Sequence, residues 1–73
     1  VFLIDDTLRR NVAFGLPPQA IDDERVRAAL RSAQLERLVG QLPDGLETQI
    51  GERGMRLSTG ERQRVGIARA LYE

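Results

Sequence analysis

The residues with the clearest chemical potential are Leu57, Ser58, Thr59, Gly60 and Glu61, which are consecutive in the sequence. Ser58 and Glu61 have the S-x-x-E spacing of a capping box, in which each side chain accepts a hydrogen bond from the other residue's backbone N–H. This spacing predicts that a helix begins here. The N–H groups of a first helical turn lack partners within the helix, and the helix dipole makes that end partly positive, so a phosphate can bind there. Taken alone, the capping box favours a plain surface helix, because many such boxes bind nothing.

The residues around this turn resemble a known family. Positions 57–71 read L-S-T-G-E-R-Q-R-V-G-I-A-R-A-L, which resembles the ABC signature, usually L-S-G-G-Q-[RK]-Q-R, together with the helix that follows it in ATP-binding cassettes. Positions 48–54 read T-Q-I-G-E-R-G, which resembles T-x-V-G-E-R-G, a loop typical of exporter-type cassettes. Two motifs in this order and at this separation are much harder to obtain by chance than one.

The resemblance implies a role for each residue of the signature turn, residues 57–61. In this family two cassettes pair head to tail, and the signature of one covers the γ-phosphate of ATP held by the other. By position, Ser58 would offer its hydroxyl and Gly60 its N–H to that phosphate, while Leu57 would anchor the turn. Thr59 replaces a family glycine and Glu61 a glutamine. We expect Glu61 to cap Ser58 rather than face the phosphate; a degenerate, weakly hydrolysing site is the alternative.

The second motif contains Gly51, Glu52, Arg53 and Gly54. From the residues alone it is a glycine-containing loop with a surface ion pair between Glu52 and Arg53, which would contribute little to stability. The resemblance implies that this loop contacts the transmembrane domain and couples ATP turnover to transport.

The sequence lacks the residues that hydrolyse ATP. It contains no G-x-x-x-x-G-K-[ST] loop, no acidic strand end for Mg2+ and no histidine. We therefore predict no catalytic residue in this chain, and we expect ATP and Mg2+ to be bound mainly by parts of the parent protein outside it. Without cysteine or histidine, a metal site of the protein's own is not expected.

Helical patterns account for most of the chain that must position these motifs. Thr7 is a candidate N-cap for a helix that runs to Phe14 and stops at Gly15, with Arg9 and Arg10 on a solvated face. Asp22 is a candidate N-cap for a second helix, whose apolar stripe is Val26, Ala29, Leu30 and Ala33. A third helix is expected after a bend near Gln34, and Pro43-Asp44-Gly45 predicts a turn. Residues 46–56 have no clear period. In the last helix, Val65, Ala68 and Tyr72 with Ile67 and Leu71 predict one wide buried arc.

The predicted fold class is mainly α, and the resemblance makes it the helical subdomain plus signature helix of a P-loop α/β ATP-binding cassette. All of residues 1–73 would belong to one such domain. Residues 1–15 would follow the glutamine loop, 16–46 form the helical subdomain, 47–56 the coupling loop, and 57–73 the signature motif and its helix. The sequence does not begin with Met and ends on a helix without a stop signal, so we expect an excerpt from a longer protein.

Composition excludes several classes of function. The 73 residues carry 11 basic and 11 acidic side chains, and this zero net charge argues against a nucleic-acid partner. No apolar run approaches the roughly 18 residues that cross a bilayer. The leading prediction is part of the ATP-binding subunit of an ABC exporter at the cytoplasmic face of a membrane, whose partners are a second cassette and a transmembrane domain. The alternatives are a non-transport ABC ATPase and an autonomous helical interaction module.

Overall fold

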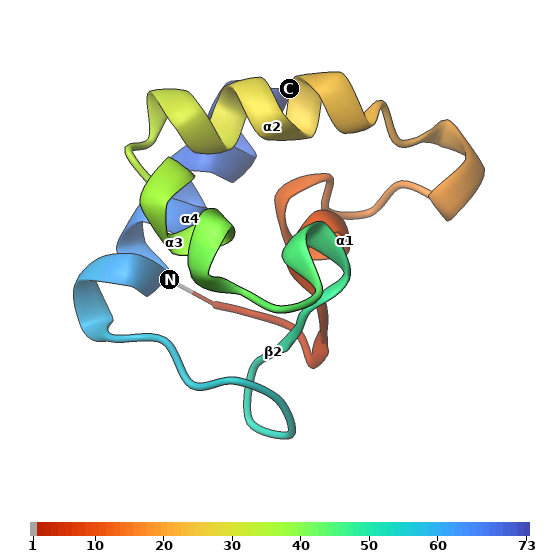
Figure 1. The fold of residues 1–73 in the computed structure, drawn as a ribbon. Helices are drawn as coiled ribbons and strands as arrows, with labels where there is room; N and C mark the ends of the chain where they lie inside the picture. The colour runs from red at the N-terminus through yellow and green to blue at the C-terminus, as the bar shows by residue number, and fades with distance from the viewer. Residues whose placement is uncertain (1) are drawn as a thin grey trace.

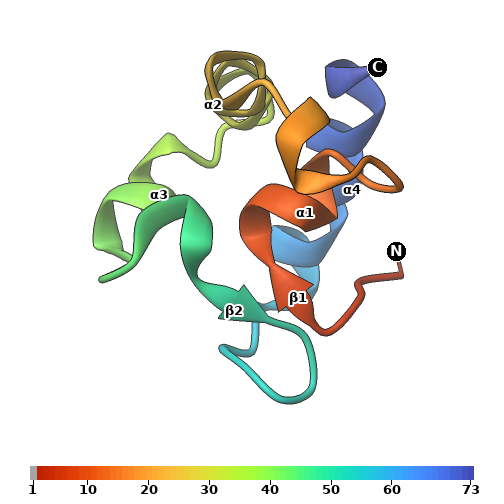
Figure 2. The same ribbon diagram turned by 90° about the vertical axis from the view of Figure 1, so that its right-hand side faces the viewer.

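A computed structural model describes residues 2–73; Val1, the first residue of the predicted 1–15 region, lies outside the described residues. The described chain is mainly helical, as the sequence predicts. Its elements, in chain order, are β1 (Asp6–Thr7), α1 (Leu8–Val12), the 3-10 helix η1 (Pro18–Ala20), α2 (Asp23–Ser32), α3 (Glu36–Gln41), the 3-10 helix η2 (Gly45–Glu47), β2 (Gln49–Ile50) and α4 (Thr59–Tyr72). Helices α1, α2 and α4 contact one another, with α2 lying across the other two (Figures 1 and 2).

Helix α1 begins where the sequence predicts and ends earlier. The Thr7 hydroxyl accepts a hydrogen bond from the Arg10 N–H at 3.1 Å, which confirms the N-cap. The helix stops at Val12 rather than Phe14, because Ala13 leaves helical geometry with ψ 54°. The Phe14 ring is then outside the core, where the guanidinium of Arg69 lies 4.5 Å from its centroid. This contact is a cation–π interaction between α4 and the end of α1.

Helix α2 has well-formed ends. The Asp22 carboxylate accepts hydrogen bonds from the N–H groups of Glu24 and Arg25, as the sequence predicts. At the other end the predicted bend is a Schellman motif. The Leu35 N–H bonds the Leu30 carbonyl at 2.9 Å and the Gln34 N–H bonds that of Arg31 at 3.0 Å. Gln34 takes the left-handed conformation, with φ 63°, which this motif requires and which usually selects glycine.

A two-stranded antiparallel ladder joins the N-terminal segment to the region after η2. Asp6 pairs with Ile50 and Thr7 pairs with Gln49. Residues 47–56 are expected to form a loop, and β2 corrects that expectation for Gln49 and Ile50. Strands of two residues are too short to show a period of two, so pairing between distant segments was not predictable from the pattern. The ladder places the 51–54 loop beside the segment that precedes α1 (Figure 2).

One apolar core lies between the helices. Its members come from α1, α2, η2, β2, α4 and the segments that connect the elements: Leu8, Val12, Ala13, Ile21, Val26, Ala29, Leu30, Ala33, Leu35, Leu42, Leu46, Ile50, Val65, Ala68 and Tyr72. Leu38 and Val39 of α3 pack against it half-buried. All four residues of the predicted α2 stripe are included, which confirms that interpretation.

The wide buried arc predicted for α4 is wrong in part. Val65, Ala68 and Tyr72 are buried, whereas Ile67 and Leu71 are 52% and 53% exposed. At about 100° per residue, Ile67 lies about 200° around the helix from Val65, so the two residues face opposite directions. Helices α1 and α2 cover the Val65 side only, and α4 therefore carries a second, uncovered apolar face.

Candidate functional site

The signature turn forms the predicted capping box at the start of α4. The Ser58 hydroxyl accepts from the Glu61 N–H at 3.1 Å, and Glu61 Oε1 accepts from the Ser58 N–H at 2.8 Å. The Arg62 N–H bonds the Ser58 carbonyl at 2.9 Å. The expected geometry of Glu61 is thereby confirmed: its carboxylate is turned back onto Ser58. Its role toward a nucleotide stays a prediction.

Two N–H groups of this turn remain available to a ligand. Within the hydrogen bonds found among residues 2–73, no acceptor is paired with the backbone N–H of Thr59 or Gly60. Both residues are exposed, and a Cβ built on Gly60 would meet no atom within 4 Å. An exposed helix end with unused N–H groups has the electrostatic character that an anion requires.

Thr59 fits the turn without backbone strain. Among the described residues, Gln34 is the non-glycine residue with positive φ, so Thr59 keeps an ordinary backbone conformation. Its hydroxyl accepts a weak hydrogen bond from Arg62 Nη2 at 3.4 Å. The departure from the family glycine is therefore accommodated in this chain, and the threonine side chain orients an arginine beside the helix start.

The two sequence motifs meet in one groove. Its volume is about 430 Å³, and its lining comes from the N-terminal segment, the 51–54 loop and the signature turn: Phe2, Leu3, Gly51, Glu52, Arg56, Leu57, Ser58, Thr59 and Arg62. Two guanidinium groups and one carboxylate line it, so its charge favours an anion. Leu57 is half-buried and packs against the core, as expected for the anchor of the turn. Gly60 and Glu61 are outside the lining.

The 51–54 loop is tightly folded. Gly51 has φ +101°, and a Cβ on it would lie 2.5 Å from Asp5 Oδ1. A Cβ on Gly54 would lie 2.4 Å from the Gln49 carbonyl oxygen, so both glycines are needed for close approach. The expected ion pair between Glu52 and Arg53 is wrong: the ion pairs within residues 2–73 are Arg9 with Asp23 and Arg10 with Asp6.

Sequence reasoning missed the polar residue that organises the turn before α1. Asn11 is fully buried, and its side chain bonds both the N–H and the carbonyl of Ile4 and the carbonyl of Thr7. Arg69 of α4 donates to the Asn11 carbonyl at 2.9 Å. Burial lowers the pKa of the Arg69 guanidinium. One signal was available: asparagine is a poor residue for a helix interior unless its side chain bonds backbone groups.

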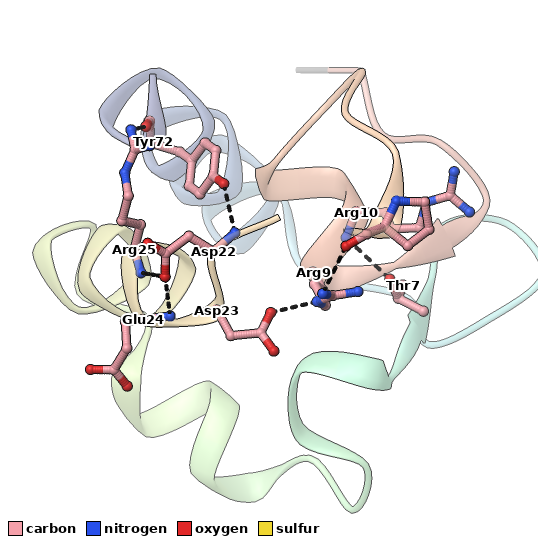
Figure 3. Close-up of polar contacts among 9 residues, drawn as sticks. Thr7, Arg9, Arg10, Asp22, Asp23, Glu24, Arg25 and Tyr72 are labelled. Carbon is pink, nitrogen blue, oxygen red and sulfur yellow. Dashed lines mark hydrogen bonds and ion pairs between the residues drawn. The ribbon is translucent and has the colours of Figure 1, made fainter. Parts of the chain in front are cut away.

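A second polar network joins α1, α2 and α4 (Figure 3). Arg9 is bound to Asp23 and donates to the Pro18 carbonyl, and its side chain is 18% exposed. The solvated face expected for Arg9 is therefore wrong, because the start of α2 places a carboxylate beside it. The hydrogen bond that the Arg9 guanidinium donates to the Asp23 carboxylate raises the pKa of Arg9 above its usual value. Arg10 remains largely exposed beside Asp6, as expected.

The remaining surface features contain none of the motif residues. A second hollow of about 230 Å³ lies between α2 and α3. In the described part of the chain, no cluster of three or more acidic, histidine or cysteine residues could hold a metal ion. None of the helices in residues 2–73 has the length and apolar character that crossing a bilayer demands.

The whole chain was compared with known protein families, curated proteins and solved structures. No protein-family model matches the chain. The ATP-dependent lipid A-core flippase of Burkholderia pseudomallei (strain 1710b) is 52% identical over 73 residues, which is 100% of this chain and 12% of the flippase. The protein of the same name from Cupriavidus metallidurans is 53% identical over 74 residues, again 12% of its length. A bacterial Atm1-family ABC exporter, solved with ATP bound, matches 96% of the chain with a TM-score of 0.80 and 41% identity.

The chain resembles a segment of ABC exporters. The likeness extends over all 73 residues in sequence and over 96% of them in three dimensions, so it includes both motifs and the helices that hold them. The chain spans 12% of the length of these relatives.

Proposed function

We propose that this chain is the helical subdomain, coupling loop and signature helix of an exporter's ATP-binding cassette. Its signature turn closes over the γ-phosphate of ATP held by a second cassette, and its 51–54 loop transmits that closure to a transmembrane domain. ATP and Mg2+ are bound mainly by other parts of the parent protein, which acts as an ATP hydrolase. The parent is a membrane transporter, and this part of it lies at the cytoplasmic face.

The groove between the two motifs carries the proposal. Unused N–H groups of Thr59 and Gly60 stand at the positive end of α4, beside a groove that contains Arg56 and Arg62. This arrangement suits a terminal phosphate presented from outside the chain. A site of this kind is complete only when the second cassette arrives, so nucleotide binding and closure are thermodynamically linked.

The position of Glu61 bears on how such a site works. Because its carboxylate accepts from the Ser58 N–H, it is held back from the N–H groups of Thr59 and Gly60. The phosphate is left to Ser58 and Gly60. The Ser58 hydroxyl donates its own proton while it accepts from Glu61, since a hydroxyl can do both.

The experiment compares two serine variants of the full-length transporter in lipid vesicles. Ser58→Ala removes the N-cap and the hydroxyl, and we expect ATP turnover to fall by about tenfold, because a helix N-cap contributes roughly 1 kcal/mol and the phosphate loses a donor. Ser32→Ala, at the exposed end of α2, is the matched control and should leave turnover unchanged. Normal turnover in Ser58→Ala would count against the proposal.

Glu61→Gln tests the orientation of the carboxylate. A glutamine Oε1 can still accept from the Ser58 N–H, so we expect ATP-driven pairing of the cassettes to rise only slightly. A large gain in pairing, measured by nucleotide-dependent crosslinking, would mean that the carboxylate of Glu61 faces the triphosphate.

A further inference from the structure

Asp5 holds the 51–54 loop through its side chain. Asp5 Oδ1 accepts a hydrogen bond from the backbone N–H of Arg53 at 3.2 Å, across 48 positions of sequence. Gly51 packs directly on the same residue, because a Cβ there would lie 2.5 Å from Asp5 Oδ1 and 3.1 Å from the Asp5 Cα. One carboxylate thus contacts two of the four residues of the loop.

The turn that contains Asp5, residues 4–7, is held in place by the buried side chain of Asn11. The Ile4 N–H donates to Asn11 Oδ1 at 2.9 Å, and Asn11 Nδ2 donates to the carbonyls of Ile4 at 3.1 Å and Thr7 at 2.9 Å. These bonds bracket Asp5 on both sides. Because Asn11 is fully buried, moving this turn would leave buried polar groups without partners, which is unfavourable.

The same asparagine is attached to the signature helix. Arg69 of α4 donates from Nε to the Asn11 carbonyl at 2.9 Å and from Nη2 to Asn11 Oδ1 at 3.5 Å. An unbroken series of contacts therefore runs from α4 through Arg69, Asn11 and the turn at residues 4–7 to Asp5 and the 51–54 loop. No other residue of the turn offers its side chain to that loop among the hydrogen bonds of residues 2–73.

We propose that Asp5 is a positioning residue that sets the conformation of the 51–54 loop relative to the signature helix. Asp5 acts as a hydrogen-bond acceptor, and Asn11 with Arg69 ties its position to α4. The consequence for transport rests on the proposed function: movement of α4 on nucleotide binding reaches the loop through this connection, so weakening it separates ATP turnover from transport.

The test uses the full-length transporter in vesicles, with hydrogen–deuterium exchange of the 51–54 amides, ATP turnover and transport measured on each variant. In Asp5→Ala we expect the Arg53 amide to exchange about fivefold faster, since an exposed charge-assisted bond is lost. ATP turnover should stay within about twofold and transport per ATP should fall by about fivefold. Asp5→Asn keeps an Oδ1 acceptor and should restore both values. Asp44→Ala is the control, because Asp44 is exposed and its side chain caps no element.

Unchanged exchange at residues 51–54 in Asp5→Ala, or an Asp5→Asn variant that behaves like Asp5→Ala, would overturn the positioning role. Glu52→Ala keeps the two proposals distinguishable. If Glu52→Ala separates turnover from transport and Asp5→Ala does not, the role of Asp5 fails and the coupling function stands. If Glu52→Ala transports normally while Asp5→Ala loosens the loop, the coupling function fails and the hold of Asp5 on the loop is supported.

Discussion

The phenolic oxygen of Tyr72 accepts a hydrogen bond from the backbone N–H of Asp22 at 3.0 Å, although 50 positions separate the two residues. The guanidinium of Arg25 lies 4.6 Å from the centre of the same ring and donates to the Tyr72 carbonyl. The last turn of α4 is in this way fastened to the first turn of α2 (Figure 3). Tyr72 therefore connects α4 to α2 through its hydroxyl, its ring and its backbone carbonyl, in addition to the core contacts of Val65 and Ala68.

Tyr72→Phe tests this connection. The ring and its contact with Arg25 remain, but the Asp22 N–H loses its acceptor, so we expect the free energy of unfolding to fall by about 1 kcal/mol. Urea denaturation followed by circular dichroism measures the change. Tyr72→Leu also removes the cation–π contact and should lower stability further. A phenylalanine variant as stable as the wild type would mean that the Asp22 N–H is satisfied equally well by water.

Gln34→Gly should stabilise the chain by about 0.5–1 kcal/mol. Gln34 has φ 63° at the end of α2, and glycine adopts this conformation without the steric conflict of a Cβ. Gln34→Ala is the matched control, since alanine keeps the Cβ and should bring no gain. Thermal unfolding of the three proteins ranks them, and equal effects of glycine and alanine would contradict the explanation.

Gly60→Ala separates folding from ligand binding. A Cβ at position 60 meets no atom within 4 Å, and alanine is a better helix former than glycine, so we expect stability to hold or to rise by up to about 1 kcal/mol. Nucleotide-dependent pairing should nevertheless decrease, because the new methyl group stands where a phosphate would approach. Either undiminished pairing or a loss of stability in Gly60→Ala would argue against a phosphate-binding role of Gly60. Gly54→Ala, whose Cβ would lie 2.4 Å from the Gln49 carbonyl oxygen, should instead disturb the fold.

Two leucines, one exposed on α4 and one buried on α2, test whether the uncovered face of α4 contributes less to stability than the core. Leu71 is 53% exposed and Leu30 is 2% exposed. We expect Leu71→Ala to change the free energy of unfolding by less than about 0.5 kcal/mol. Leu30→Ala should lower it by about 2–5 kcal/mol through the lost contacts and the cavity. Denaturant unfolding measures both, and a large loss in Leu71→Ala would contradict the exposure of that side chain.

Local patterns predicted the parts of the fold that local physics determines. The caps at Thr7, Asp22 and Ser58 each depend on a side chain bonding an N–H two or three positions later, and each was confirmed. The α2 stripe and the turn after α3 depend equally on near neighbours. Pairing of β1 with β2 and the ion pair of Arg9 depend on distant segments, which a pattern along the chain does not encode.

In the candidate site, too, the features set by near neighbours were predictable and those set by distant segments were not. The capping geometry of Ser58 and Glu61 followed from their spacing, and the family likeness drew attention to the 51–54 loop. Asn11 holds the turn before α1, and Asp5 of that turn holds the 51–54 loop, which lines the groove together with the signature turn. Neither residue belongs to a motif. Their bonds reach residues 7 and 48 positions away, which local spacing does not predict.

Helix α4 also has a practical consequence for work on this protein in solution. Ile67 and Leu71 are one helical turn apart on a side that nothing in the described chain covers. A preparation of these 73 residues alone would expose this apolar surface of α4 to water. Sedimentation or light-scattering measurements on such a sample would detect self-association through this surface before any response to nucleotide. An Ile67→Ser or Leu71→Ser variant is therefore needed as the reference sample.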